Sequence, residues 1–75
     1  MRRLLQKGVD RLKTVITNSK GTFYVIYERY EGRYSFNTTK NIEEATIFNT
    51  PTEAQSLINS SVFPWKGLGF KISPK

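Results

Sequence analysis

Residues 23–37, FYVIYERYEGRYSFN, decide the fold because they predict a β-hairpin. Aromatic and β-branched residues dominate both halves of this stretch, and Glu31-Gly32 lies between the halves as the turn. A turn of two or four residues places Arg29 opposite Tyr34 and Tyr27 opposite Phe36. The alternation along each strand then assigns one face to the core, with Phe23, Val25, Tyr27, Tyr34 and Phe36. The opposite face carries Tyr24, Ile26, Glu28, Tyr30, Arg33, Ser35 and Asn37.

The segment after the hairpin contains two helix-start signals. Asn41 can cap a single turn over residues 42–44, after which residues 45–48 favour a short third strand or an extended link. The stretch 50–53, TPTE, combines a capping hydroxyl, a proline at the first helical position and a glutamate three residues after the cap. It predicts a helix over 51–59 that buries Ala54, Leu57 and Ile58. A final strand follows, in which Leu68, Phe70 and Ile72 alternate with Gly69, Lys71 and Ser73.

Residues 2–17, before the hairpin, separate into two faces when they are wound at about 100° per residue. The apolar face holds Leu4, Leu5, Val9, Leu12, Val15 and Ile16, and cations dominate the rest. This pattern favours an amphipathic helix that ends at the turn residues 18–21, NSKG. The run 14–17, TVIT, is β-branched, so a strand that forms a hairpin with the next segment is the alternative.

These elements predict an α+β fold: a small antiparallel sheet of three to four strands, an N-terminal amphipathic helix and a second helix at about 51–59. The chain has 75 residues, which allows one domain over 1–75. We expect residues 1–20 to form a basic amphipathic helical arm, packed on or beside a core over 22–75 with the order ββ(β)αβ.

The net charge of +6 is concentrated near the start of the sequence. Up to Gly21, six cations stand against Asp10 alone, a net +5, whereas the remaining residues carry six cations and five acids, a net +1. Such an arm points to a polyanion, an acidic protein surface or an anionic membrane, and a solvated helix face is the plainer alternative. A secretory signal needs an uninterrupted apolar core, and polar residues break up the apolar residues near the start of this sequence. We therefore expect a cytoplasmic location.

The chain lacks residues that several enzyme classes require. The chain has neither histidine nor cysteine, which removes the commonest general base, the thiol nucleophile and the usual zinc ligands. The stretch 67–69, GLG, lacks the third glycine, the preceding strand and the following helix of a dinucleotide-binding loop. We therefore expect a protein that is not an enzyme, with no catalytic residues, no cofactor and no metal.

Binding is the remaining class of function. The candidate residues are the cations of the arm and turn together with exposed aromatic and basic side chains: Arg2, Arg3, Lys7, Arg11, Lys13, Lys20, Tyr24, Tyr30, Arg33 and Trp65. The leading hypothesis is a host protein or protein–nucleic-acid complex as partner, and direct binding of DNA or RNA by the basic arm is the alternative. Adsorption to a membrane through the amphipathic helix is a third, weaker possibility. Tyr24 and Tyr30 could instead cover the second face of the sheet, and Trp65 could lock the bend at 62–69 onto the core.

Residues 41–54, NIEEATIFNTPTEA, follow the tyrosine-rich hairpin and precede the final strand. This arrangement, with Ala45, Phe48 and then a capped helix containing Glu53-Ala54, resembles small uncharacterised proteins of phages that infect Gram-positive bacteria. The resemblance implies an accessory protein in the host cytoplasm that binds and inhibits a host factor, as anti-CRISPR proteins do. The basic charge argues against an acidic mimic of DNA and favours docking on an acidic surface or on nucleic acid.

Overall fold

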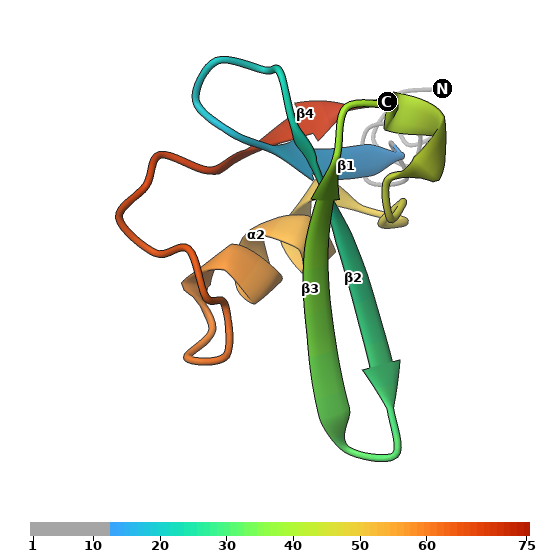
Figure 1. Cartoon of the computed structure of the whole chain (residues 1–75), viewed down its shortest axis with the longest axis vertical. Coiled ribbons are helices and arrows are strands. Elements are labelled where there is room, and N and C mark those ends of the chain that lie inside the picture. Colours follow the sequence, from blue (N-terminus) through green and yellow to red (C-terminus); the bar gives the residue numbers. More distant parts are fainter. Residues whose placement is uncertain (1–12) are drawn as a thin grey trace, which may run out of the picture.

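The computed structural model describes residues 13–75, which form a four-stranded antiparallel sheet and one α-helix (Figure 1). The strands are β1 (Thr14–Thr17), β2 (Tyr24–Tyr30), β3 (Arg33–Thr39) and β4 (Lys71–Pro74), in the spatial order β3-β2-β1-β4. A short 3-10 helix, η1 (Ile42–Glu44), follows β3, and the α-helix is α2 (Pro51–Asn59). The α+β class with a small antiparallel sheet is therefore confirmed.

β1 lies inside the sheet, between β2 and β4, and all four of its residues are buried. It pairs with β4 along its whole length, with Ile16 opposite Ile72. The prediction of a helix through Thr17 is wrong, because a run of β-branched side chains buried on both faces suits a central strand better than a half-exposed helix. The alternative, a strand that turns back into the next segment, is confirmed. The rest of the predicted arm, residues 1–12, lies outside the described residues.

β2 and β3 form the predicted hairpin in the predicted register, with Arg29 opposite Tyr34 and Tyr27 opposite Phe36. The turn residues Glu31 and Gly32 have φ values of 49° and 79°, the paired positive φ of a type I′ turn. The hairpin projects beyond the rest of the molecule (Figure 1).

The hairpin face assigned to the core is only partly covered. Val25 is buried, and Tyr27 and Phe36 pack against the core. Phe23 and Tyr34 retain 38% and 43% of their accessible surface, so the prediction that these two residues belong to the core is wrong. They lie toward the two ends of this face.

The sheet is split between β1 and β2, whose registered pairing is Thr17 with Tyr24. Residues 46–48 lie in the split and bond to both strands. The Thr46 amide donates to the Val25 carbonyl of β2 at 3.1 Å. On the β1 side, the Phe48 amide donates to the Thr14 carbonyl at 2.8 Å, and the Thr14 amide donates to the Phe48 carbonyl at 2.9 Å. Residues 45–48 are therefore the extended link that the sequence allowed, with a single bridge to β1 in place of a third strand.

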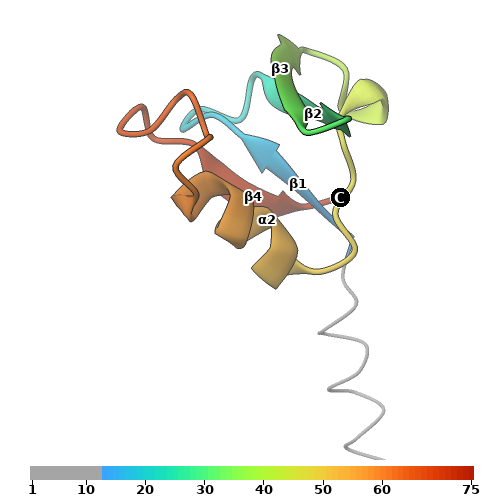
Figure 2. The same cartoon turned by 90° about the horizontal axis from the view of Figure 1, so that it is seen from below.

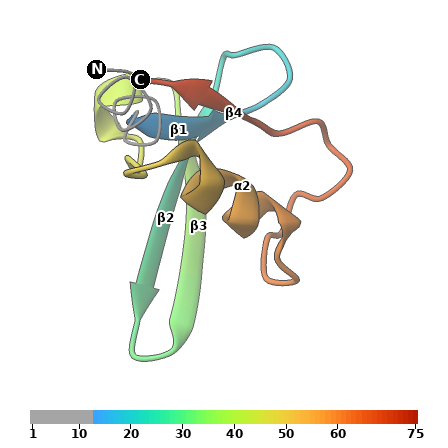
Figure 3. The same cartoon turned by 180° about the vertical axis from the view of Figure 1, so that it is seen from behind.

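α2 begins at Pro51, as the capping residues predict, and the Thr50 hydroxyl accepts a hydrogen bond from the Glu53 amide at 3.2 Å. The helix lies against β4 and β1 on one side of the sheet (Figures 2 and 3). Its fully buried Ala54 joins Ile16, Val25 and Phe63 at the centre of the core. Asn41 caps η1 by accepting from the Glu43 amide, again as expected.

Aromatic rings extend the core toward the hairpin. Phe36 contacts both Phe63 and Trp65 edge to face, with ring centroids 5.8 and 6.0 Å apart. Trp65 also stacks on Phe70 at 5.3 Å. Edge-to-face and offset stacks are the favoured geometries of aromatic pairs, so the bend before β4 is fixed to the hairpin by its rings.

Candidate functional site

An open groove of about 860 Å³ lies at the end of the sheet where β1 turns into β2. Four segments meet around it: the loop 18–22, the start of β2, the end of β3 and residues 67–70. The side chains that line it are Asn18, Ser19, Lys20, Thr22, Phe23, Thr38, Lys40, Leu68 and Phe70.

The loop 18–22 forms one wall and is held by the side chain of Asn18. The amide oxygen of Asn18 accepts hydrogen bonds from the backbone amides of Thr22 at 2.8 Å and Phe23 at 3.2 Å. Its amide nitrogen donates to the Thr22 hydroxyl at 2.9 Å, and Gly21 takes a left-handed φ of 72°. Asparagine in such local side-chain bonds stabilises a turn, so the backbone that carries Lys20 is fixed while Lys20 itself is exposed.

Residues 67–70 form the facing wall, and Gly69 allows this segment to lie close to Ser19. Gly69 has a φ of 86°, and a Cβ atom added there would lie 3.0 Å from the Cβ atom of Ser19. Only glycine combines this conformation with so close an approach. The contact brings the two walls together and holds Leu68 at the rim, where 62% of its surface stays exposed.

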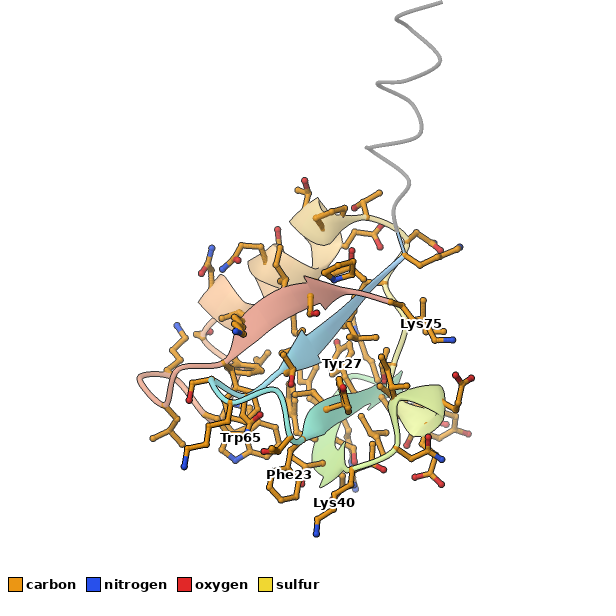
Figure 4. All side chains as sticks on the ribbon, turned by 90° about the horizontal axis from the view of Figure 1, so that it is seen from above. Phe23, Tyr27, Lys40, Trp65 and Lys75 are labelled. Atoms are coloured by element: carbon orange, nitrogen blue, oxygen red, sulfur yellow. The ribbon has the colours of Figure 1, made fainter. Side chains whose placement is uncertain are left out.

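The groove combines positive charge with apolar surface. Lys20 and Lys40 supply its charges, and none of its lining residues is acidic. The Lys40 ammonium lies 5.7 Å from the centroid of the Phe23 ring, and Figure 4 shows the two side chains together at this end of the molecule. Ammonium groups beside an aromatic face suit an anionic group attached to an apolar one. The lining contains no carboxylate, imidazole or thiol that could act as a general base or nucleophile.

The structure does not bring the sequence-predicted site residues together. Lys20 lies in the groove, whereas Lys13 precedes the other end of β1 and donates to the Asn49 side-chain oxygen at 3.0 Å. Tyr30 is 73% exposed and pairs with Arg33 at the tip of the hairpin. Half-buried Tyr24 lies at the opposite end of β2, about 20 Å away at 3.4 Å per residue.

The remaining predicted site residues are Trp65 and four cations of the N-terminal arm. Trp65 is half-buried among the core rings, so the alternative that it locks the bend onto the core is the one that the contacts support. Arg2, Arg3, Lys7 and Arg11 lie outside the described residues.

The predicted site residues do not include four that line the groove: Phe23, Lys40, Leu68 and Phe70. A signal for Lys40 was present, because extending the hairpin register by one pair beyond Tyr24 and Thr39 sets Phe23 opposite Lys40. Leu68 carried no such signal, since its place in the groove depends on the contact between Gly69 and Ser19, which are distant in sequence.

No family model matches the chain, and neither a curated protein nor a solved structure is significantly similar to it. Within residues 13–75, no group of three or more acidic, histidine or cysteine side chains could hold a metal ion. The helices in that range are also too short or too polar to cross a bilayer.

Proposed function

We propose that this protein is a non-enzymatic binding module that captures an acidic segment of a partner protein in the groove. The observation that carries the proposal is the pairing of Lys20 and Lys40 with exposed Phe23 and Leu68, in a groove lined by no acid. The ammonium groups would steer and orient carboxylates, and the apolar side chains of the groove would bury one large side chain of the partner.

The apolar part of the groove favours a protein segment over nucleic acid. Leu68, 62% exposed, offers an aliphatic contact that suits a leucine or phenylalanine side chain and adds little to phosphate binding. A nucleic-acid track requires a line of cations with stacking rings between them. The exposed pair Tyr30 and Arg33 lies at the far end of the hairpin, about 20 Å from Tyr24 at the groove end.

The resemblance of residues 41–54 to phage proteins suggests a biological role for this binding module. The module would act in the host cytoplasm as an inhibitor of the anti-CRISPR kind, by occupying a surface of a host protein or protein–nucleic-acid complex. A basic groove fits an acidic patch on such a target.

Selection of random peptides displayed on phage tests the chemistry of the partner without naming it. We expect the selected peptides to share one aromatic or leucine residue flanked by Asp or Glu. A synthetic peptide of that consensus should bind the double variant Lys20→Glu/Lys40→Glu at least about tenfold more weakly than the wild type. The matched control is Lys66→Glu/Lys71→Glu, which changes net charge equally outside the groove and should leave the affinity within about twofold.

Two results would contradict the proposal. One is a set of selected peptides without acidic residues, or with affinity indifferent to Lys20 and Lys40. The other is strong binding of labelled oligo-dT that falls by about three to five decades between 50 and 200 mM salt, which would assign the protein to nucleic acid instead.

A further inference from the structure

The outer edge of β3 is a second surface suited to binding. β3 is an edge strand of seven residues, Arg33–Thr39, and pairs with β2 without a bulge. Figure 2 shows β3 as the outermost strand of the sheet. Edge strands are commonly short, bulged or blocked by proline or lysine, because an open ladder recruits other strands. The other edge, β4, has four residues and ends at Pro74. β3 has none of these protections.

The hairpin geometry determines which backbone groups of β3 point outward. A two-residue type I′ turn makes Tyr30 and Arg33 a hydrogen-bonded pair, and every second residue of β3 after Arg33 then bonds to β2. The N–H and C=O groups of Tyr34, Phe36 and Thr38 therefore point away from β2. Within residues 13–75, no backbone hydrogen bond joins these groups to another segment.

We infer that β3 of a second copy completes this ladder, antiparallel and in register about a two-fold axis at Phe36. Tyr34 then pairs with Thr38 of the second copy, Phe36 with its own counterpart, and Thr38 with Tyr34. All three pairs join outward-pointing residues, so each pair forms two hydrogen bonds and no free group is left over. The two sheets become one continuous sheet with an isologous interface.

Charge complementarity favours a second copy as the occupant. The antiparallel register sets Arg33 of one copy opposite Thr39 of the other, on the same face of the sheet. The hydroxyl of Thr39 donates to a carboxylate oxygen of Glu44 at 2.6 Å, so the guanidinium of Arg33 would meet that carboxylate. The two-fold axis repeats this cation–carboxylate pair. A parallel alignment would set the two Arg33 side chains beside each other, which costs free energy.

Self-pairing would also alter the groove. Thr38 lines the groove, and Tyr34 of the second copy would lie directly opposite Thr38. The second copy would thus add an aromatic side chain to the wall formed by the end of β3.

Sedimentation equilibrium of the full chain, from about 10 μM to 1 mM, tests this inference. We expect a concentration-dependent shift from the monomer mass of 8.7 kDa to twice that value. Arg33→Glu and Glu44→Arg should each raise the dimer dissociation constant at least about tenfold by opposing like charges. The double variant Arg33→Glu/Glu44→Arg restores opposite charges and should return the constant to within about threefold of the wild type.

Lys71→Glu is the matched control, because Lys71 is an exposed cation on β4, at the other edge of the sheet. It should leave the dimer constant unchanged, and circular dichroism should show every variant folded. A wild type that stays monomeric up to about 1 mM would overturn the inference. So would a dimer that the double variant fails to restore, since that result excludes the Arg33–Glu44 register.

Discussion

Replacing Thr46 by valine should destabilise the protein through the split between β1 and β2. The Thr46 hydroxyl accepts a hydrogen bond from the Tyr27 amide at 2.7 Å and donates to the Tyr27 carbonyl at 3.0 Å. One side chain thus satisfies both backbone groups of a residue that has no ladder partner on β1. Valine has the same shape without the hydroxyl, so both backbone groups of Tyr27 lose their partner.

The expected loss follows from the cost of an unpaired polar group. A buried unpaired backbone group costs about 1–3 kcal/mol, and half-buried Thr46 and Tyr27 place the two groups toward the low end of that range. We therefore expect Thr46→Val to lower the free energy of unfolding by about 2 kcal/mol. At about 4–8 °C per kcal/mol for a domain of this size, the melting temperature should fall by roughly 8–16 °C.

Urea unfolding followed by the fluorescence of Trp65, the one tryptophan of the chain, measures this loss. Thr46→Ser is the matched control, since it keeps the hydroxyl and removes one methyl group worth about 0.8 kcal/mol. The serine variant should therefore be the more stable of the two by about 1 kcal/mol. A valine variant as stable as the serine variant, at equal denaturant slope, would refute the role of the hydroxyl.

Four further substitutions test other contacts. Phe63→Ala removes a ring at the centre of the core and should cost about 3–5 kcal/mol, enough to leave a chain this short largely unfolded by circular dichroism; a cooperative melt near that of the wild type would be inconsistent with this. Gly69→Ala and Gly67→Ala should each cost about 1–2 kcal/mol, because both glycines have a left-handed φ. The melting temperature should fall further for Gly69→Ala, because of the two only Gly69 lies close to Ser19. Equal falls would show that Ser19 moves aside without cost. Asn18→Ala should speed amide hydrogen exchange at Thr22 and Phe23 about tenfold, and unchanged exchange would argue that the loop holds without its side-chain bonds.

Local signals were enough to predict the hairpin and α2. The turn at Glu31-Gly32 and the alternation around it fix the register, and Thr50 with Pro51 fixes the helix start. Each of these features depends on residues within a few positions of one another, where backbone propensity and capping decide the outcome.

Long-range pairing was not predictable in the same way. Leu12, Val15 and Ile16 fit the helical period, but a short apolar run fits a buried strand equally well. The partner that decides between them is β4, more than fifty residues further along the chain. The groove has the same origin, because Lys20 and Leu68 meet only after distant segments have packed.

The position of β1 has a consequence for how the chain folds. β2 and β3 can close their hairpin across two residues, and α2 can form from its own capping residues. β1 gains its full set of partners only when Thr14 meets Pro74 and Phe48, which requires the closure of long loops. We expect this closure to limit the folding rate, so that the hairpin forms early and the centre of the sheet is completed last.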